Sequence, residues 1–410
     1  MKRVLFIGLV FPESGSTAAG TRMLQLITFF KEHNYHISFG SAAQESPFSD
    51  DLTQFDVKQI SIELNNTYFD TFVKDLDPEI VVFDRFIAEE QFGWRVAENC
   101  PKAIRILDTE DLHCLRMARL EAFKKNIIFD INALVNFDIT KRELASIYRC
   151  DLSLIISSYE FNLLTDVFKI PREILFELPF MLDRITKEQI SNEPSFKERV
   201  DFISIGNFKH EPNWQSVLYL KKAIWPLIKE QLPNAQLLIY GAYTNQKVTD
   251  LHNEKENFLI KGRAEDAHKV IEKARVLLAP LQFGAGLKGK LIDAMQTGTP
   301  SVTTSIGAEG MHGALPWNGF IEDSPDEFAN KAVELYTNQE IWTQAQKNGI
   351  TIINTNSDKT RLTVKLLQRI VQLKENLKDH RKDNFMGQIL QHHTLQSTKY
   401  LSKWIEAKNS

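Results

Sequence analysis

The chain has 410 residues, of which 43% are apolar and 25% charged, and its formal net charge is −4. This length exceeds what one hydrophobic core usually serves, so the sequence predicts at least two globular domains. The negative charge argues against a nucleic-acid partner, which requires a strongly basic surface. Cys100, Cys114 and Cys150 lack metal-ligand spacing and suit free thiols in a reducing compartment, so we expect a cytoplasmic protein.

The N-terminal segment MKRVLFIGLVF has two basic residues before an apolar run, as a signal peptide has. The run is short, and Pro12 and Glu13 follow it at once, which favours a first buried strand. No apolar run in the sequence reaches the roughly 18 residues of a membrane span.

Short apolar runs alternate with helical patterns in the first half of the chain. Residues 17–33 have apolar side chains at helical spacing. The predicted strands are 4–10, 36–40, 79–84, 103–108 and 152–157. Continuous apolar strands separated by helices indicate parallel strands that are buried on both faces. We therefore predict a doubly wound, Rossmann-like α/β domain over residues 1–185.

A polar stretch without apolar periodicity ends this series, and we place a linker at residues 186–200. A second alternating series predicts another Rossmann-like domain over residues 201–357, with strands at 202–206, 236–241, 257–262, 275–281 and 300–304. Two such domains enclose a cleft between the carboxyl ends of their sheets, where open α/β folds bind ligands.

Residues 358–410 are predicted to form a basic helical extension. Between 359 and 382 there are eight Lys or Arg residues against two acids, and one apolar stripe consists of Leu362, Leu366, Ile370, Leu373 and Leu377. The favoured interpretation is a helix docked on the protein with a solvated basic face. The alternative is a helix that binds a partner or the inner face of the membrane.

The segment PLQFGAGLKGKLIDAM contains a phosphate-loop pattern, G-x-x-x-x-G-K, at residues 284–290, between a predicted strand and a predicted helix. An ATPase loop needs a Ser or Thr hydroxyl for Mg²⁺ after the lysine, and Leu291 has none. The loop also comes late in the chain, and no apolar strand with a metal-binding Asp follows it. These features argue against an ATPase.

A metal-free diphosphate site fits the same residues. The glycines allow backbone N–H groups to approach an anion, and the following helix directs its positive end there. Lys288 and Lys290 can neutralise a diphosphate, and Asp293, about one turn into the helix, can accept hydrogen bonds from a ribose diol. The structural alternative is a tight turn in which Asp293 only stabilises the helix N-terminus.

Three segments of the second half follow one another in an order and spacing typical of one family. They are FISIGNFKHEPNWQSVLYLKKAIWPLI, LPNAQLLIYG and IKGRAEDAHKVIEKARVLLAPLQFGAGLKGKLIDAMQTGTPSVTTSIGAEGM. Together they resemble the donor-binding domain of the family 4 retaining glycosyltransferases (glycosyl transferases group 1), which have the GT-B fold. The first half resembles that family only in its first strand and glycine loop.

The resemblance implies that Asp293 matches the second glutamate of the family's E-x7-E motif, which holds the nucleotide ribose. The first glutamate would fall at Ala285, so the contact with the donor sugar departs from the common pattern. A branch of the family with a G-x-G-L-K-x-K loop is the better match. The loop residues implied in donor binding are Gly284, Gly286, Leu287, Lys288 and Lys290.

Further site residues follow from the same resemblance. Gly15 and Ser16 would approach the donor phosphate or the acceptor, and Arg22 would add a positive charge on the acceptor side. A plain strand–helix turn is the alternative for this loop. Asn207 and Lys209 would contact the diphosphate and Arg263 the base, against the alternative of exposed surface residues.

His113 is the candidate catalytic residue. It follows Asp108, Glu110 and Asp111 after a predicted strand, and acid–histidine proximity by itself suggests a metal site or a general base. The family resemblance instead implies a histidine near the donor sugar. The structural alternative is helix capping by Asp108 and Asp111.

The resemblance implies a hexosyltransferase of polysaccharide biosynthesis that needs neither cofactor nor metal. It would move a sugar from a UDP- or GDP-sugar to a hydroxyl of a glycan or lipid-linked acceptor, with retention of configuration. Two alternatives stay open, namely a nucleotide-sugar epimerase of the same fold and a non-catalytic binding or scaffold protein.

Overall fold

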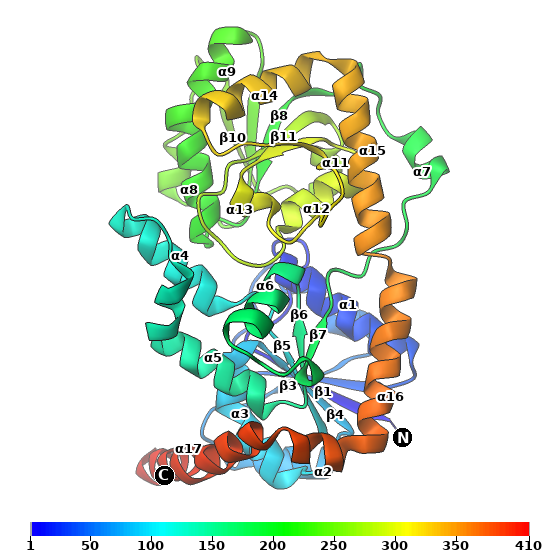
Figure 1. Cartoon of the computed structure of the whole chain (residues 1–410), viewed down its shortest axis with the longest axis vertical. Helices are drawn as coiled ribbons and strands as arrows, with labels where there is room; N and C mark the ends of the chain where they lie inside the picture. The colour runs from blue at the N-terminus through cyan, green and yellow to red at the C-terminus, as the bar shows by residue number, and fades with distance from the viewer. Residues whose placement is uncertain (1, 410) are drawn as a thin grey trace.

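The computed structural model describes residues 2–409, apart from the side chains of residues 395, 396 and 409. Two parallel α/β domains lie one above the other, and the last two helices return to the first domain (Figure 1). The predicted fold class, two Rossmann-like domains with a C-terminal helical segment, is confirmed.

The first domain is built on a parallel sheet of seven strands. In spatial order the strands are β3 (Lys58–Ser61), β2 (His36–Ser41), β1 (Arg3–Gly8), β4 (Ile80–Asp84), β5 (Ile104–Asp108), β6 (Leu152–Ile155) and β7 (Leu175–Glu177). The N-terminal apolar run is therefore the interior strand β1, in register with β2 at Val4–Ile37 and with β4 at Val4–Ile80.

Helices cover both faces of this sheet, as continuous apolar strands require. One face packs against α1 (Ala18–Glu32) and α16 (Lys359–Asp383). The other face packs against α2 (Tyr68–Leu76), α3 (Arg85–Asn99), α4 (His113–Lys125), α5 (Asp138–Arg149) and α6 (Ser158–Asn162). Short 3₁₀ or π-helical turns lie at Leu52–Phe55, Ile131–Asn136, Leu163–Val167, Arg172–Ile174 and Leu220–Ile224.

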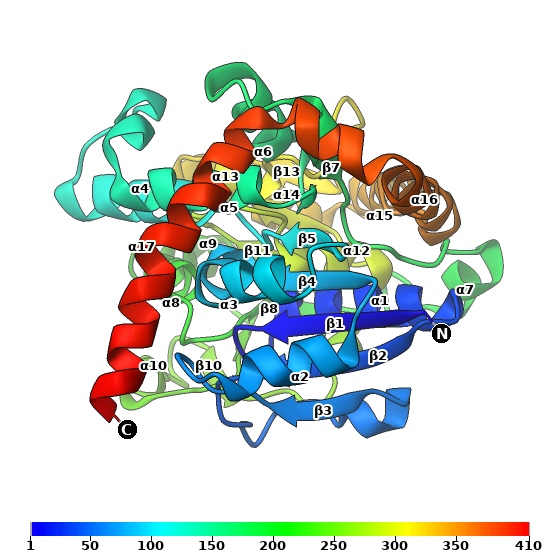
Figure 2. The same cartoon turned by 90° about the horizontal axis from the view of Figure 1, so that it is seen from below.

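The C-terminal segment completes the first domain. Leu362, Leu366, Ile370 and Leu373 of the apolar stripe are at most 5% exposed and lie in the core beside β1 and β2. The following helix, α17 (Phe385–Asn409), crosses the end of the domain along α3 and α5 (Figure 2). Within residues 2–409, no helix is long and apolar enough to cross a membrane.

The second domain has a parallel sheet of six strands. Their order is β10 (Phe258–Gly262), β9 (Leu237–Tyr240), β8 (Val200–Ile205), β11 (Ala274–Ala279), β12 (Ser301–Thr303) and β13 (Gly319–Ile321). The predicted linker contains the short helix α7 (Lys187–Asn192). The other helices are α8 (Glu211–Tyr219), α9 (Trp225–Gln231), α10 (Gln246–Thr249), α11 (Ala267–Ile271), α12 (Gly289–Gln296), α13 (Ser305–Ala308), α14 (Pro325–Thr337) and α15 (Gln339–Asn356).

Each sheet has one switch point, a pair of adjacent strands from which the chain continues toward opposite edges of the sheet. It lies between β1 and β4 in the first sheet and between β8 and β11 in the second. Ligands of open α/β sheets bind in the crevice at the carboxyl ends of such strands. The loops that follow β1 and β8 both line one pocket, so the two crevices face each other.

Candidate active site

The loop that follows β11 turns tightly against the first domain. Gly286 has a left-handed φ of 65°, and a Cβ atom there would lie 2.8 Å from the Cβ atom of Asp111. A Cβ atom on Gly289 would lie 2.7 Å from that of Ala18. Only glycine combines this φ with so close an approach. The glycines thus bring the loop and the N-terminus of α12 to the interface of the two domains.

The two loop lysines have different surroundings. Lys288 is 9% exposed, and its Nζ donates to the carbonyl oxygen of Gly286 at 2.6 Å. Lys290 Nζ donates to Asn213 Oδ1 at 2.9 Å and borders Gly206, which follows β8. Burial lowers the pKa of each ammonium group to about 8. Lys290 therefore lies at the switch point of the second sheet, whereas Lys288 holds the loop itself.

Asp293 has a partner that the sequence analysis did not single out. Its side chain is 34% exposed, and its Oδ1 lies 3.4 Å from His268 Nε2 on α11. The hydrogen bond with Asp293 raises the pKa of His268 above its ordinary value. A partly exposed carboxylate of this kind can accept hydrogen bonds from two neighbouring hydroxyl groups.

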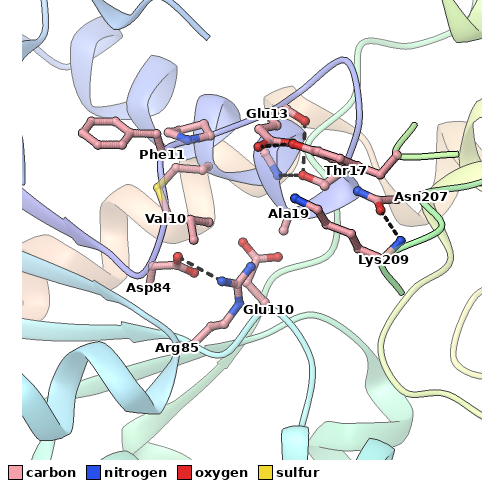
Figure 3. A pocket seen from close by; sticks show the side chains of 14 residues that line it. Val10, Phe11, Glu13, Thr17, Ala19, Asp84, Arg85, Glu110, Asn207 and Lys209 are labelled. Carbon is pink, nitrogen blue, oxygen red and sulfur yellow. Dashed lines mark hydrogen bonds and ion pairs between the residues drawn. The ribbon is translucent and has the colours of Figure 1, made fainter. Parts of the chain in front are cut away.

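The loop after β8 faces the first domain across a pocket of about 220 Å³ (Figure 3). Asn207 Oδ1 accepts a hydrogen bond from the backbone N–H of Lys209 at 2.9 Å. The Lys209 ammonium lies 3.5 Å from the centre of the Tyr243 ring, a cation–π contact. Tyr243 donates its hydroxyl to Glu13 at 2.8 Å, which joins this edge of the cleft to the first domain.

Arg263 reaches the glycine loop of the first domain. Its guanidinium lies 4.5 Å from the centre of the Phe48 ring, and one of its nitrogens would be 3.1 Å from a Cβ atom on Gly15. The hydroxyl of Ser16 is buried and has no hydrogen-bond partner among the described residues. The structure thus brings Gly15 and Ser16 of the first domain together with Arg263 of the second domain at one end of the cleft.

His113 is the first residue of α4 and is 9% exposed. Burial lowers its pKa to about 4, so the imidazole is neutral at neutral pH. Its Nε2 lies 3.5 Å from Asp111 Oδ1. The alternative of capping by Asp108 and Asp111 is wrong, because Leu112 is the N-cap residue and the carboxyl oxygens of Glu143, on α5, accept the backbone N–H groups of His113 and Cys114 at 3.0 and 2.8 Å. The part of the chain that the structure describes holds no group of three or more His, Cys, Asp or Glu residues that could bind a metal.

Arg22 is directed into the first domain. It is 1% exposed, its Nε donates to Asp108 at 2.9 Å, and an NH group donates to the Leu178 carbonyl at 2.6 Å. The expectation of a positive charge on the acceptor side is corrected by this geometry, because the guanidinium is engaged by a buried carboxylate and a carbonyl. Arg22 instead fixes the end of β5 beneath the cleft.

Two side chains of the first domain hold the loop after β11. Glu160 is fully buried, and its Oε1 accepts a hydrogen bond from the Gly286 N–H at 2.8 Å. Arg119 donates to the Gly284 carbonyl at 2.8 Å and to both carboxylate oxygens of Glu309 at 2.7 Å. These partners are 126 to 190 residues apart in sequence, so no local pattern predicts them.

Comparison with known proteins finds a family match in the second domain. Residues 199–338 match the family model described as "Glycosyl transferases group 1". A curated relative from Klebsiella pneumoniae, "Uncharacterized 44.6 kDa protein in cps region", is 22% identical over 242 residues. The match covers 56% of this chain and 59% of the relative, so the chain spans about three fifths of that protein's length.

Solved structures share the whole architecture. A glycosyltransferase from Rickettsia africae superposes with a TM-score of 0.64 at 14% identity, over 92% of this chain and 99% of that one. The Anabaena protein Alr3699/HepE, solved with UDP-glucose, superposes with a TM-score of 0.63 at 14% identity, over 91% of this chain and 100% of that one. Sucrose-phosphate synthase from Thermosynechococcus elongatus superposes with a TM-score of 0.67 at 14% identity, over 91% of this chain and 99% of that one. The chain therefore has a GT-B fold, and residues 199–338 of its second domain are similar to a glycosyl transferases group 1 domain.

Proposed function

We propose that the protein is a retaining glycosyltransferase that moves a hexosyl group from a UDP- or GDP-sugar to an acceptor hydroxyl without a metal. The observation that supports this most is the pair of facing crevices. One contains Lys290, Asp293 and the N-terminus of α12, and the other is the pocket of the first domain. The group 1 family match spans the first of these crevices.

The donor diphosphate would lie between Lys290 and the glycine loop at Gly15. The ammonium group and the N–H groups of α12 would stabilise the charge that develops as the sugar–phosphate bond breaks. The acceptor oxygen forms its bond to the anomeric carbon on the same face, and its proton passes to the departing phosphate oxygen. Neutral His113 would contribute a hydrogen bond near the sugar and no positive charge.

Donor binding would use the groups that the resemblance implies. Asp293 would hold the ribose, Asn207 and Lys209 the diphosphate, and Arg263 the edge of the base. Lys288 and the carbonyl contacts of Arg119 would keep the loop in shape. The closed cleft would exclude water and so limit hydrolysis of the donor.

We also propose a lipid-linked or glycan acceptor and a peripheral contact with an anionic membrane through α17. The stripe on α16 is buried, but Tyr400 and Trp404 on α17 are 62% and 60% exposed, with Lys403 exposed beside them. Exposed aromatic side chains with nearby lysines suit a lipid interface. Flotation with phosphatidylglycerol vesicles tests this: Y400S/W404S should lose binding, and retention of binding would contradict it. I128S, which changes a 95% exposed residue elsewhere, is the control.

The proposed activity is tested with a panel of UDP- and GDP-sugars. A donor should raise the melting temperature by mass action and should be turned over in the presence of EDTA. Conversion of the free donor to an epimer would instead show an epimerase. Nucleotide binding without turnover of any donor would show a binding or scaffold protein. Turnover that EDTA abolishes would contradict the metal-free site.

A further inference from the structure

The pocket of about 220 Å³ lies at the switch point of the first sheet, opposite the loops that follow β8 and β9. Its floor follows β4 and β5, and its walls include apolar side chains from the loop after β1 and from α1, such as Phe11 and Met23. A crevice at this place in an open α/β sheet is where a ligand of the first domain would bind. None of the donor-binding groups above except Asn207 and Lys209 lines it.

Two carboxyl groups form the floor of this pocket (Figure 3). Asp84 is 4% exposed; its Oδ2 accepts the Leu9 N–H at 3.1 Å, and its Oδ1 is buried without a partner among the described residues. Glu110 is 8% exposed, and its buried Oε1 likewise has no partner in that part of the chain. Buried carboxyl oxygens without partners are costly, so their presence here needs a reason.

The backbone beneath these groups is also unusual. Arg85 and Glu110 both have left-handed φ angles, of 67° and 62°. Side chains with a Cβ atom disfavour this region, and such residues cluster at ligand sites, where the surrounding structure enforces them. Both follow the carboxyl ends of neighbouring strands, so the strained backbone delivers both side chains to one pocket (Figure 3).

The electrostatic state of the floor favours hydroxyl groups as ligands. Burial raises the pKa of Asp84, and burial together with the charge of Asp108 raises the pKa of Glu110 well above its ordinary range. The positive charge of Arg85 lowers the pKa of both carboxyl groups, and that of Arg22 lowers the pKa of Glu110, so these charges partly offset the effect of burial. These effects favour the neutral form of the carboxyl group, most strongly at Glu110, and a neutral carboxyl group can donate as well as accept hydrogen bonds, as a hydroxyl group does.

We infer that this pocket is the acceptor subsite and that Asp84 and Glu110 select an uncharged, hydroxyl-bearing ring, such as a neutral sugar unit. Two ring hydroxyls would bond to the unpartnered oxygens of Asp84 and Glu110, and the apolar face of the ring would lie against Phe11 and Met23. A carboxylate or phosphate group on the ring cannot donate a hydrogen bond to these oxygens, and the nearest cation, Arg85, already lies 3.4 Å from Asp84 Oδ2. A ring that carries such a group would therefore bring an unpaired charge into a buried floor and would bind more weakly. This inference rests on the proposed function, since it names the acceptor class of that reaction.

The test measures acceptor binding directly, with octyl hexosides as neutral probes and octyl glucuronide as the charged match of octyl glucoside. Saturation-transfer NMR in the presence of UDP should show binding of a neutral hexoside to the wild type and about tenfold weaker binding of the glucuronide. D84N and E110Q, which preserve side-chain shape, should each weaken neutral-hexoside binding by about tenfold. Each should also reduce the difference in affinity between the neutral hexoside and the glucuronide. E90Q, which removes a charge from an exposed pair with Arg142, should match the wild type.

The affinity for UDP and the melting temperature of each variant report whether it is folded. Unchanged hexoside affinity and discrimination in both folded variants would overturn the inference. Loss of UDP affinity in folded D84N or E110Q would also overturn it, because the pocket would then belong to the donor. Failure of the wild type to turn over any nucleotide sugar would refute the proposed function instead, and hexoside binding is measured independently of turnover.

Discussion

A carboxyl oxygen of Glu160, on α6 of the first domain, accepts a hydrogen bond of 2.8 Å from the backbone N–H of Gly286 in the second domain. The same oxygen accepts the Leu112 N–H at 3.1 Å. Gly286 directly follows Ala285, the position at which the resemblance places the first glutamate of the family motif. The carboxyl group of Glu160 thus lies next to Ala285, although it belongs to the other domain. Its hydrogen bond to Gly286 links the conformation of the loop after β11 to the contact between the two domains.

E160Q is expected to weaken the pH dependence of stability. Burial raises the pKa of Glu160 from 4.5 to about 8, so the folded chain keeps a proton that the unfolded chain releases between these values. The free energy of unfolding therefore falls by up to about 1.4 kcal/mol per pH unit as the pH rises through this window. Melting temperatures at pH 6 and pH 8 should differ less in E160Q than in the wild type. E121Q, at an exposed pair with Lys125, is the control, and equal pH slopes in E160Q and the wild type would contradict the assignment.

Donor affinity is expected to fall at alkaline pH because of Lys290. Its pKa of about 8 in the free protein must rise when a diphosphate binds beside it. Affinity contributed by the charged form is therefore complete below pH 8 and falls by up to about tenfold per unit above it. Calorimetric titration of UDP and GDP between pH 7 and 9 measures this. K290R, which stays charged, should flatten the profile, and an unchanged slope in K290R would show that another group titrates.

R119A is expected to loosen the two domains. The substitution leaves the carboxylate of Glu309 and the carbonyl of Gly284 without their partner, and loss of one member of a buried pair costs about 3–5 kcal/mol. The melting temperature should fall, and small-angle scattering should show a larger radius of gyration without nucleotide. R142A, at an exposed pair, should change neither quantity. A compact R119A chain with wild-type stability would refute the role of this contact.

Asp293 is expected to distinguish ribose from its dideoxy analogue. The wild type should bind UDP about tenfold or more tightly than 2′,3′-dideoxyuridine diphosphate, because the carboxylate accepts hydrogen bonds from the diol. D293A should lose most of its UDP affinity and bind both nucleotides equally. E265A changes an exposed acid near α11 and should retain the preference. A preference that survives in D293A would place the ribose elsewhere.

The buried strands could be predicted from the sequence, and some edge strands could not. Continuous apolar runs located β1, β4, β5, β8 and β11, which lie inside their sheets. The strands β3, β7 and β13 were missed, and each lies at an edge of its sheet and is three or four residues long. Edge strands are half solvated, so their sequence need not carry a continuous apolar run.

Some features of the candidate site could likewise be predicted from local sequence, and others could not. The glycines of the donor loop and the start of α12 have local signals, and the helix begins at Gly289, one residue before Lys290. Local patterns did not predict that Lys288 donates a hydrogen bond to the Gly286 carbonyl within its own loop. Nor did they predict that Arg22 forms a buried ion pair with Asp108. They also did not predict Glu160, because its contact with Gly286 depends on how the two domains dock. Side-chain direction and contacts between domains follow from tertiary packing.

The central claim is tested most directly by proton NMR of a UDP- or GDP-hexose incubated with the protein in EDTA. We expect that the anomeric signal of one donor decays, that nucleoside diphosphate is released, and that the first sugar product has the same anomeric configuration as the donor. A product of opposite configuration would contradict the retaining mechanism. Stable signals for every donor, in a protein that still binds the nucleotide, would contradict the proposed activity itself.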